Sequence, residues 1–111
     1  MELQLNTPLP SVDAPDFIEQ LQQAISARLP EIESELVTDL SHISHFANYQ
    51  GGMAIERIEN LGDNQFLMHY GFDWQINNAC ADQLHEGRAQ EKVRFRYQAP
   101  GLVVFRILKF D

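Results

Sequence analysis

The residues best suited to hold a metal ion are Asp39, His42 and His45, which stand three positions apart. On a helix, residues at this spacing share a face, so each adjacent pair could meet one ion. Zinc accepts imidazole and carboxylate ligands, and a catalytic zinc site would add water to three of them. Asp39 and His45, however, would lie ~9 Å apart along a helix axis, too far for one tetrahedral ion. We therefore expect no metal site, and we place both histidines near a helix end, where an imidazolium complements the negative dipole.

No other pattern in the chain assembles a catalytic site. Glu31, Glu33 and Glu35 could work as acid–base carboxylates, but at the start of a helix they serve the exposed N–H groups. His69 and Asp73 share one face of an expected strand, yet ~13 Å of strand separates them, too far for a direct dyad. The glycines match neither a dinucleotide fingerprint nor a phosphate loop. The sequence thus predicts neither a cofactor nor a set of catalytic residues.

Three arginines form the most suggestive set of binding residues. Arg94, Arg96 and Arg106 stand at alternating positions of two expected strands, so they can share the open face of a sheet. His69 and Asp73, from the preceding strand, would be their neighbours. Guanidinium groups bind phosphate, carboxylate or an acidic protein surface well, which predicts a small anion or an acidic protein as partner. The alternative is cross-strand charge pairing on a solvated face.

Aromatic residues support a second hypothesis, a small-molecule-binding or enzymatic pocket between helices and sheet. Tyr70 and Trp74 belong to one strand and Tyr97 to another, so the three could line the walls of such a pocket. His69 or Arg94 would then supply the polar contact. The same aromatic stripe more often forms a hydrophobic core than a pocket wall. A pocket of this kind needs a volume of at least ~300 Å³.

Two helices are expected in the first half of the chain. Asp13 is a suitable N-cap for the first helix, and Pro30 can end that helix and open the next. Apolar residues recur at spacings of three and four in both segments. The first stripe consists of Phe17, Leu21, Ala24, Ile25 and Leu29. The second stripe consists of Ile32, Leu36, Leu40 and Ile43. Gly51-Gly52 closes the helical half.

The apolar period changes to two in the second half, which indicates strands. The expected strands are 53–59, 65–76, 92–98 and 102–110. The clearest is 65–76, in which Phe66 to Ile76 alternate apolar residues on one face with mainly polar residues on the other. A polar stretch with Gly87, residues 77–89, is expected as a long loop. Turn residues at 61–64 and 99–101 join the remaining strands.

Helices followed by strands predict an α+β fold. We expect two N-terminal helices packed on one face of a curved four-stranded antiparallel sheet. Residues 1–111 form a single domain in this prediction, because no repeat or linker divides them. An extended lead-in covers 1–12, the helical layer 13–50 and the sheet 51–111.

The last strand should be an edge strand, and it is apolar on both sides. Its outward residues, away from the helices, are Leu102, Val104, Leu108 and Phe110. Edge strands are usually short or charged so that chains do not pair, and a strand apolar on both faces is normally covered on both. A second copy related by a two-fold axis would provide that cover, so we predict a homodimer. The alternatives are the 77–89 loop folding back and a different protein.

Charge and composition limit the function classes. The 111 residues carry a net charge of −8, which argues against a nucleic-acid-binding protein. Residues 1–63 hold 11 acids and two bases, whereas residues 64–111 hold five acids and six bases. No apolar run approaches the ~20 residues that cross a bilayer, so no membrane role is expected. The single Cys80 and the lack of a signal-like start predict a cytoplasmic protein. These features favour a small binding or interaction protein that acts through its open sheet face and last strand.

Overall fold

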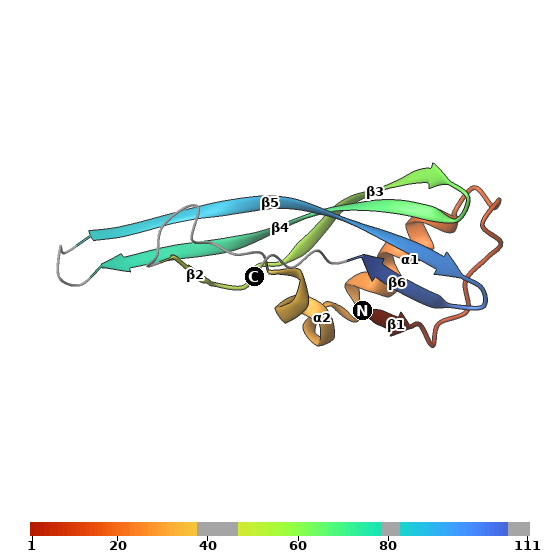
Figure 1. The fold of residues 1–111 in the computed structure, drawn as a ribbon, viewed down its shortest axis with the longest axis horizontal. Coiled ribbons are helices and arrows are strands. Elements are labelled where there is room, and N and C mark those ends of the chain that lie inside the picture. Colours follow the sequence, from red (N-terminus) through yellow and green to blue (C-terminus); the bar gives the residue numbers. More distant parts are fainter. Residues whose placement is uncertain (38–46, 79–82, 107–111) are drawn as a thin grey trace.

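The computed structural model describes residues 1–37, 47–78 and 83–106 and has the expected α+β architecture (Figure 1). Its elements are β1 (Glu2–Gln4), α1 (Phe17–Ser26), α2 (Leu29–Leu36), β2 (Ala47–Tyr49), β3 (Ala54–Gly62), β4 (Gln65–Asn78), β5 (Gln83–Gln98) and β6 (Leu102–Arg106). The helices pack on one face of a curved antiparallel sheet. Over the described residues this sheet has six strands rather than four, in the order β1-β6-β5-β4-β2 with β3 also paired to β4. The two unexpected strands, β1 and β2, are three residues each, too short to produce a periodic sequence signal.

The first helix begins later than its sequence suggests. Asp16, not Asp13, is the N-cap of α1, and Ala14 donates its N–H to the Ser11 carbonyl in a turn before it. The expected apolar stripe is confirmed, since its members in α1 are buried: Phe17, Leu21, Ala24 and Ile25. The break between the helices comes at Ala27, and Pro30 stands in the first turn of α2, where its missing N–H is not required.

The second helix is shorter than its stripe predicts. Ile32 and Leu36 are buried as expected, but α2 ends at Leu36 because Val37 adopts an extended conformation with ψ 119°. Leu40 and Ile43, the other two residues of that stripe, lie outside the described residues. The three residues considered for metal binding, Asp39, His42 and His45, also lie outside the described residues, and so does the single cysteine, Cys80.

The hydrophobic core lies between the helices and the inner face of β4, β5 and β6. The alternation predicted for β4 is confirmed, because Phe66, Met68, Tyr70 and Phe72 are all at most 2% exposed. Phe17 of α1 supplies the main aromatic contacts from the helical layer. Its ring centroid lies 5.8 Å from that of Phe66 and 5.1 Å from that of Tyr97. One apolar helix face therefore covers the centre of the sheet.

The long hairpin of β4 and β5 gives the molecule its elongated shape, with extents of 54 × 26 × 21 Å. The two strands pair without interruption from Gln65↔Arg96 to Asn78↔Gln83. The long loop expected at 77–89 is therefore wrong, because residues from Gln83 onward belong to β5. Figure 1 shows this outer end of the hairpin extending beyond both helices. Paired strands that no helix covers need no alternation of apolar residues, so their sequence resembles that of a loop.

Left-handed residues mark the connections at both ends of β3. Asp63 and Asn64 both have positive φ, 52° and 61°, which makes the β3–β4 connection a two-residue loop of the type that matches strand twist. Gly51 and Gly52 also have positive φ, and they separate β2 from β3. Both strands lie along the same side of β4, with Asp73 exchanging backbone hydrogen bonds with residues 50 and 51.

The start of the chain covers the last described strand. Glu2, Leu3 and Gln4 pair with residues 104, 103 and 102 of β6, and the Phe105 N–H donates to the Met1 carbonyl at 2.7 Å. The expectation that the last strand is an edge is therefore wrong over its described length. Residues 1–12 are more than a lead-in, because β1 completes this side of the sheet and buries Leu3 to 4% exposure.

No helix among the described residues has the length and apolar character needed to cross a membrane.

Candidate functional site

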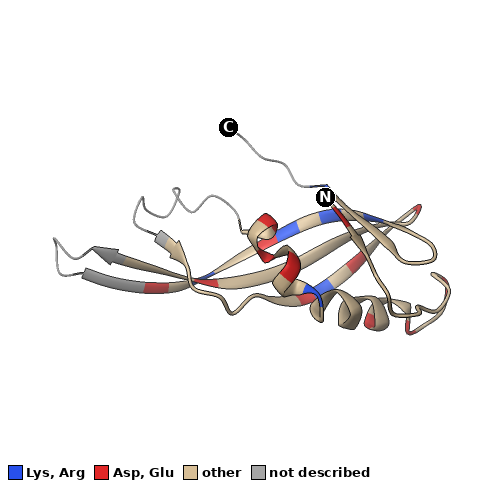
Figure 2. Cartoon of the chain, turned by 90° about the horizontal axis from the view of Figure 1, so that it is seen from below, with Lys and Arg blue, Asp and Glu red and all other residues tan. Residues whose placement is uncertain are grey.

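The open face of the sheet, opposite the helices, carries a cluster of basic side chains on β5 and β6. Arg94 stands directly opposite Arg106, Arg96 stands opposite Val104, and Lys92 stands opposite His69 of β4. All four cations are exposed. We call them the basic cluster: Lys92, Arg94, Arg96 and Arg106. Figure 2 shows Lys and Arg positions on the strands and Asp and Glu positions on both the helices and the strands.

The spacing within the basic cluster follows from strand geometry. Directly opposite residues have Cβ atoms ~5 Å apart, so Arg94 and Arg106 are close like charges, an arrangement that destabilises a sheet. Arg96 follows Arg94 on the same face after ~7 Å of strand. Within the described residues, none of the four cations has a carboxylate at ion-pair distance. Glu2, the acid of β1 nearest in register, pairs with Val104 and forms no such contact.

A second part of the open face, on β3 and β4, has its charges paired. His69 Nε2 lies 2.6 Å from Glu59 Oε1, and Arg57 Nη2 lies 3.0 Å from the same oxygen. Arg57 and His69 are direct cross-strand neighbours, so one carboxylate serves two partners. This group neutralises itself locally and offers no free cation.

A third part of the open face, toward the outer end of the hairpin, is also paired. Arg88 Nη1 lies 3.0 Å from Asp73 Oδ1 and donates to the Gly52 carbonyl at 3.0 Å. The guanidinium lies across Gly71, where an added Cβ would come within 3.0 Å of Arg88 Nε. At Gly52 an added Cβ would meet the Asp73 carboxylate at 2.2 Å. Two glycines therefore make room for this ion pair.

The structure thus brings the predicted open-face residues to one side of the sheet but divides them by partner. His69 and Asp73 are bound to Glu59 and Arg88, not to the three arginines predicted as their neighbours. Cross-strand charge pairing, the alternative interpretation of this face, describes these two groups. Among the described residues, the basic cluster shows no such charge pairing.

The aromatic residues predicted for a pocket occupy two different environments. Tyr70 and Tyr97 are 2% and 3% exposed and belong to the core. The Tyr70 hydroxyl donates to the Leu36 carbonyl at 2.6 Å, and burial raises the pKa of that hydroxyl well above its usual value. Trp74 lies farther out along β4, half-buried, with its indole over Gly87, where an added Cβ would come within 2.3 Å of the ring.

The residues predicted for a dimer interface are described only in part. Leu102 and Val104 are half-buried and point to the open face, as the register of β6 with β5 requires. Leu108 and Phe110 lie outside the described residues. In register with Arg96, Val104 adds an apolar surface beside the basic cluster, and Leu67, half-buried and opposite Arg94, adds another.

Arg57, Glu59 and Arg88 are open-face residues that the sequence did not reveal as a set. Arg88 is fifteen positions from Asp73, and only the β4–β5 register brings them together. Among the described residues, no group of three or more His, Cys, Asp and Glu side chains could hold a metal ion. The arrangement can therefore hold negatively charged oxygens by hydrogen bonds from guanidinium groups.

Comparison with known proteins finds no matching family model, no matching curated protein and no matching solved structure.

Proposed function

We propose that this protein binds an acidic segment of a partner protein through the basic cluster. The observation that carries the proposal is the direct opposition of Arg94 and Arg106 without a carboxylate partner among the described residues. Elsewhere on the same face, cations are matched by Glu59 and Asp73. Two opposed like charges cost stability in the free protein, and a bound carboxylate removes that cost.

The surroundings of the basic cluster favour a protein segment over a single ion. Leu67 stands beside Arg94 and Val104 beside Arg96, so half-buried apolar side chains alternate with the cations across the strands. A segment that presents acids and apolar residues together would satisfy both kinds of surface. Arg is well suited to this role because its planar guanidinium can bind a carboxylate through two hydrogen bonds.

The acidity of the remaining surface makes this binding local and salt-dependent. With a net charge of −8 the protein repels an acidic partner at long range, and only the basic cluster attracts it. Exposed charges are screened within ~10 Å at an ionic strength of 0.1 M. We therefore expect binding at low salt that weakens steeply as salt rises.

Two further parts of the proposal concern assembly and compartment. The homodimer stays a prediction, but β1 now covers the edge of β6, so a two-fold contact would use the face that bears Leu102 and Val104. The cytoplasm is the compartment we propose, because a single cysteine, Cys80, cannot form a disulfide within the chain.

Thermal unfolding at low ionic strength tests the proposed function. We expect poly-glutamate to raise the melting temperature more than phosphate or sulfate does at equal charge concentration. The double variant Arg94→Ala plus Arg106→Ala should lose most of that shift, because it removes the opposed guanidinium pair. Arg28→Ala is the matched control, since Arg28 is paired with Glu31 on another surface and should leave the shift intact.

Two outcomes would contradict the proposal. Equal shifts with phosphate, sulfate and poly-glutamate would indicate a small-anion site in place of a protein-binding face. An unchanged melting curve with all three would show that the opposed arginines bind no anion.

A further inference from the structure

The side of the sheet opposite β1 ends in an unpaired strand edge. β3 is nine residues long and pairs with β4 on one side, and no described strand lies along its other side. Edge strands expose backbone N–H and C=O groups that can pair with another chain. β3 is the longest outer strand among the described residues, since β1 and β2 have three residues each.

The register shows which backbone groups of β3 point outward. The Ile55 carbonyl accepts a hydrogen bond from Gln22 of α1, so it faces away from β4. β4 pairs with β5 without a register shift. Its residues 70, 68 and 66 stand opposite Ile55, Ile58 and Asn60 of β3. Because alternate residues of an antiparallel pair belong to the same hydrogen-bonding class, all three direct their N–H and C=O groups outward.

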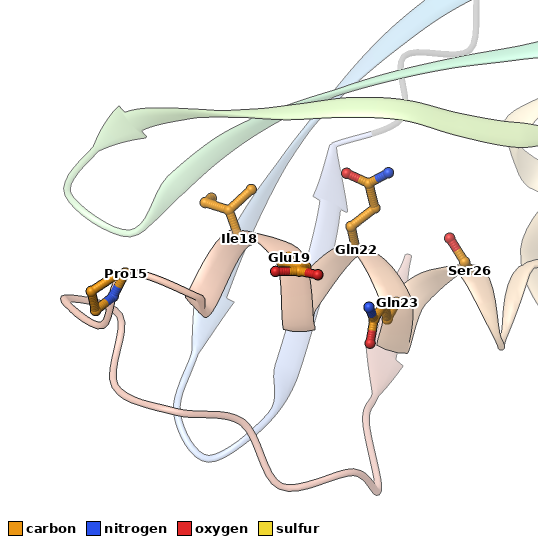
Figure 3. A pocket seen from close by; sticks show the side chains of 6 residues that line it. All are labelled: Pro15, Ile18, Glu19, Gln22, Gln23 and Ser26. Carbon is orange, nitrogen blue, oxygen red and sulfur yellow. The ribbon is translucent and has the colours of Figure 1, made fainter.

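Helix α1 forms the second wall beside this edge. A pocket of 620 Å³ runs along one stripe of the helix, lined by Pro15, Ile18, Glu19, Gln22, Gln23 and Ser26. Figure 3 shows Ile18 and Gln22 of this stripe pointing toward β3. The Gln22 amide lies 3.4 Å from the Ile55 carbonyl and so occupies one acceptor of the strand edge. A strand laid along β3 would lie next to this stripe of α1.

The pocket on α1 beside the β3 edge is negatively charged. On the helix side, Glu19 is exposed in the lining and Asp13 and Asp16 precede α1, with no base between residues 13 and 27. On the strand side, Glu56 and Glu59 lie on the open face, where Gln90, Arg57 and His69 contact them, so the negative charge beside the edge comes from the helix. An extended segment with Lys or Arg side chains matches this balance, whereas an acidic segment would be repelled.

Two irregularities confine pairing to a short part of the edge. The register of β3 shifts between Ile55 and Arg57 and again between Asn60 and Gly62. Bulges and charged residues are the usual protection of an edge against indiscriminate pairing. Between the two register shifts, the N–H and C=O groups of Ile58 and Asn60 point outward and can pair. Ile55 lies next to them, and its carbonyl accepts from the Gln22 amide.

We infer that the open edge of β3, beside the pocket on α1, docks an extended, basic segment of a partner protein, which adds to the sheet as a strand. Backbone hydrogen bonds to the edge give affinity in this mode, and contacts of alternate side chains give specificity. Displacement of the Gln22 amide frees the Ile55 carbonyl for the incoming strand. This surface lies apart from the basic cluster and takes a partner of opposite charge.

A displayed library of random ten-residue peptides, screened against the full chain, tests the inference. The enriched peptides should be rich in Lys and Arg with β-branched or aromatic residues at alternate positions. With a synthetic copy of the most enriched peptide, hydrogen exchange of the Ile58 and Asn60 amides should slow. Enrichment of no peptide, or of acidic peptides only, would overturn the inference.

Three variants separate strand addition from general attraction. Asn60→Pro removes one outward N–H at an exposed edge position, so affinity should fall about ten-fold, whereas Asn60→Thr keeps the N–H and should bind normally. Glu19→Lys, also at an exposed position, should weaken the basic peptide without changing the fold. Binding that is unchanged in both Asn60→Pro and Glu19→Lys would contradict the docking site. Arg94→Ala plus Arg106→Ala should leave it intact, which keeps this test independent of the proposed function.

Discussion

The inner and outer halves of β4 share one alternating pattern but have different surroundings. In the inner half, Phe66, Met68, Tyr70 and Phe72 are buried under the helices. In the outer half, Trp74 and Ile76 continue the same face but are half-buried. Figure 1 shows that the described helices lie under the inner half only. Alternation in sequence therefore identifies the inward face of a strand, whereas burial depends on what packs against that face.

The helical layer explains why burial ends where it does. α1 and α2 have ten and eight residues, so their lengths are ~15 Å and ~12 Å, much less than the length of the hairpin. At the outer end of the buried stretch, Phe72 contacts Tyr49 of β2, and the two ring centroids lie 5.5 Å apart. The outer half of β4 is thus held chiefly by neighbouring strands.

The largest expected difference between the halves comes from truncating equivalent inward side chains. Phe66→Ala should lower the free energy of unfolding by about 3–5 kcal/mol, because it opens a cavity at a fully buried position. Ile76→Ala should cost less than about 1.5 kcal/mol, since Ile76 already meets solvent. Urea denaturation of both variants measures the contrast. Equal losses would show that the outer half is packed as tightly as the inner half.

Gly87 tests the outer half directly. Gly87→Ala should cost about 1–3 kcal/mol, because the added methyl group collides with the Trp74 indole that lies over this glycine. Fluorescence of Trp74, the single tryptophan, reports its displacement during the same urea titration. Combining Gly87→Ala with Trp74→Phe should recover part of the loss. A fully tolerated Gly87→Ala would mean that the indole moves aside without cost.

The smallest expected effect concerns the hydroxyl groups of the inner half. Tyr70→Phe should cost about 1 kcal/mol at neutral pH, because the Leu36 carbonyl loses its donor. Burial raises the pKa of Tyr70, and the folded state therefore holds this proton more tightly than the unfolded chain. Its stabilisation is complete below the unfolded pKa of about 10 and is lost as pH rises above it. Tyr70→Phe should flatten that alkaline decline, and an unchanged slope in alkaline urea titrations would assign it to other groups.

The sequence predicted those parts of the fold that a helix or core pattern encodes locally. The apolar stripe of α1 and the alternation of β4 were sufficient to assign two helices packed on an antiparallel sheet, and both are confirmed. The outer part of β5 has the sequence pattern of a loop, because strands outside the helical layer need no apolar face. β1 was missed because three residues are too few to show a period, and its partner stands about a hundred positions away.

The candidate site was predictable to the same extent. Alternation placed Arg94, Arg96 and Arg106 on one face, and the β5–β6 register confirms that placement. Which acids neutralise which cations depends on cross-strand register, so the Arg88–Asp73 pair could not be deduced. The four expected strands place 53–59 at the edge opposite the last strand, and β3 is indeed paired only with β4.

The pairing of β1 with β6 has a consequence for how the chain is made. β1, α1 and α2 precede in the chain the strands that complete their apolar faces, so these strands emerge from the ribosome later. β1 itself waits longest, because residues 2–4 pair with residues 102–104. Contacts so distant in sequence slow folding, since the entropy of closing the long loop is lost before the contact forms. During synthesis, the apolar faces of α1 and α2 therefore stay uncovered until the strands that pack against them have followed.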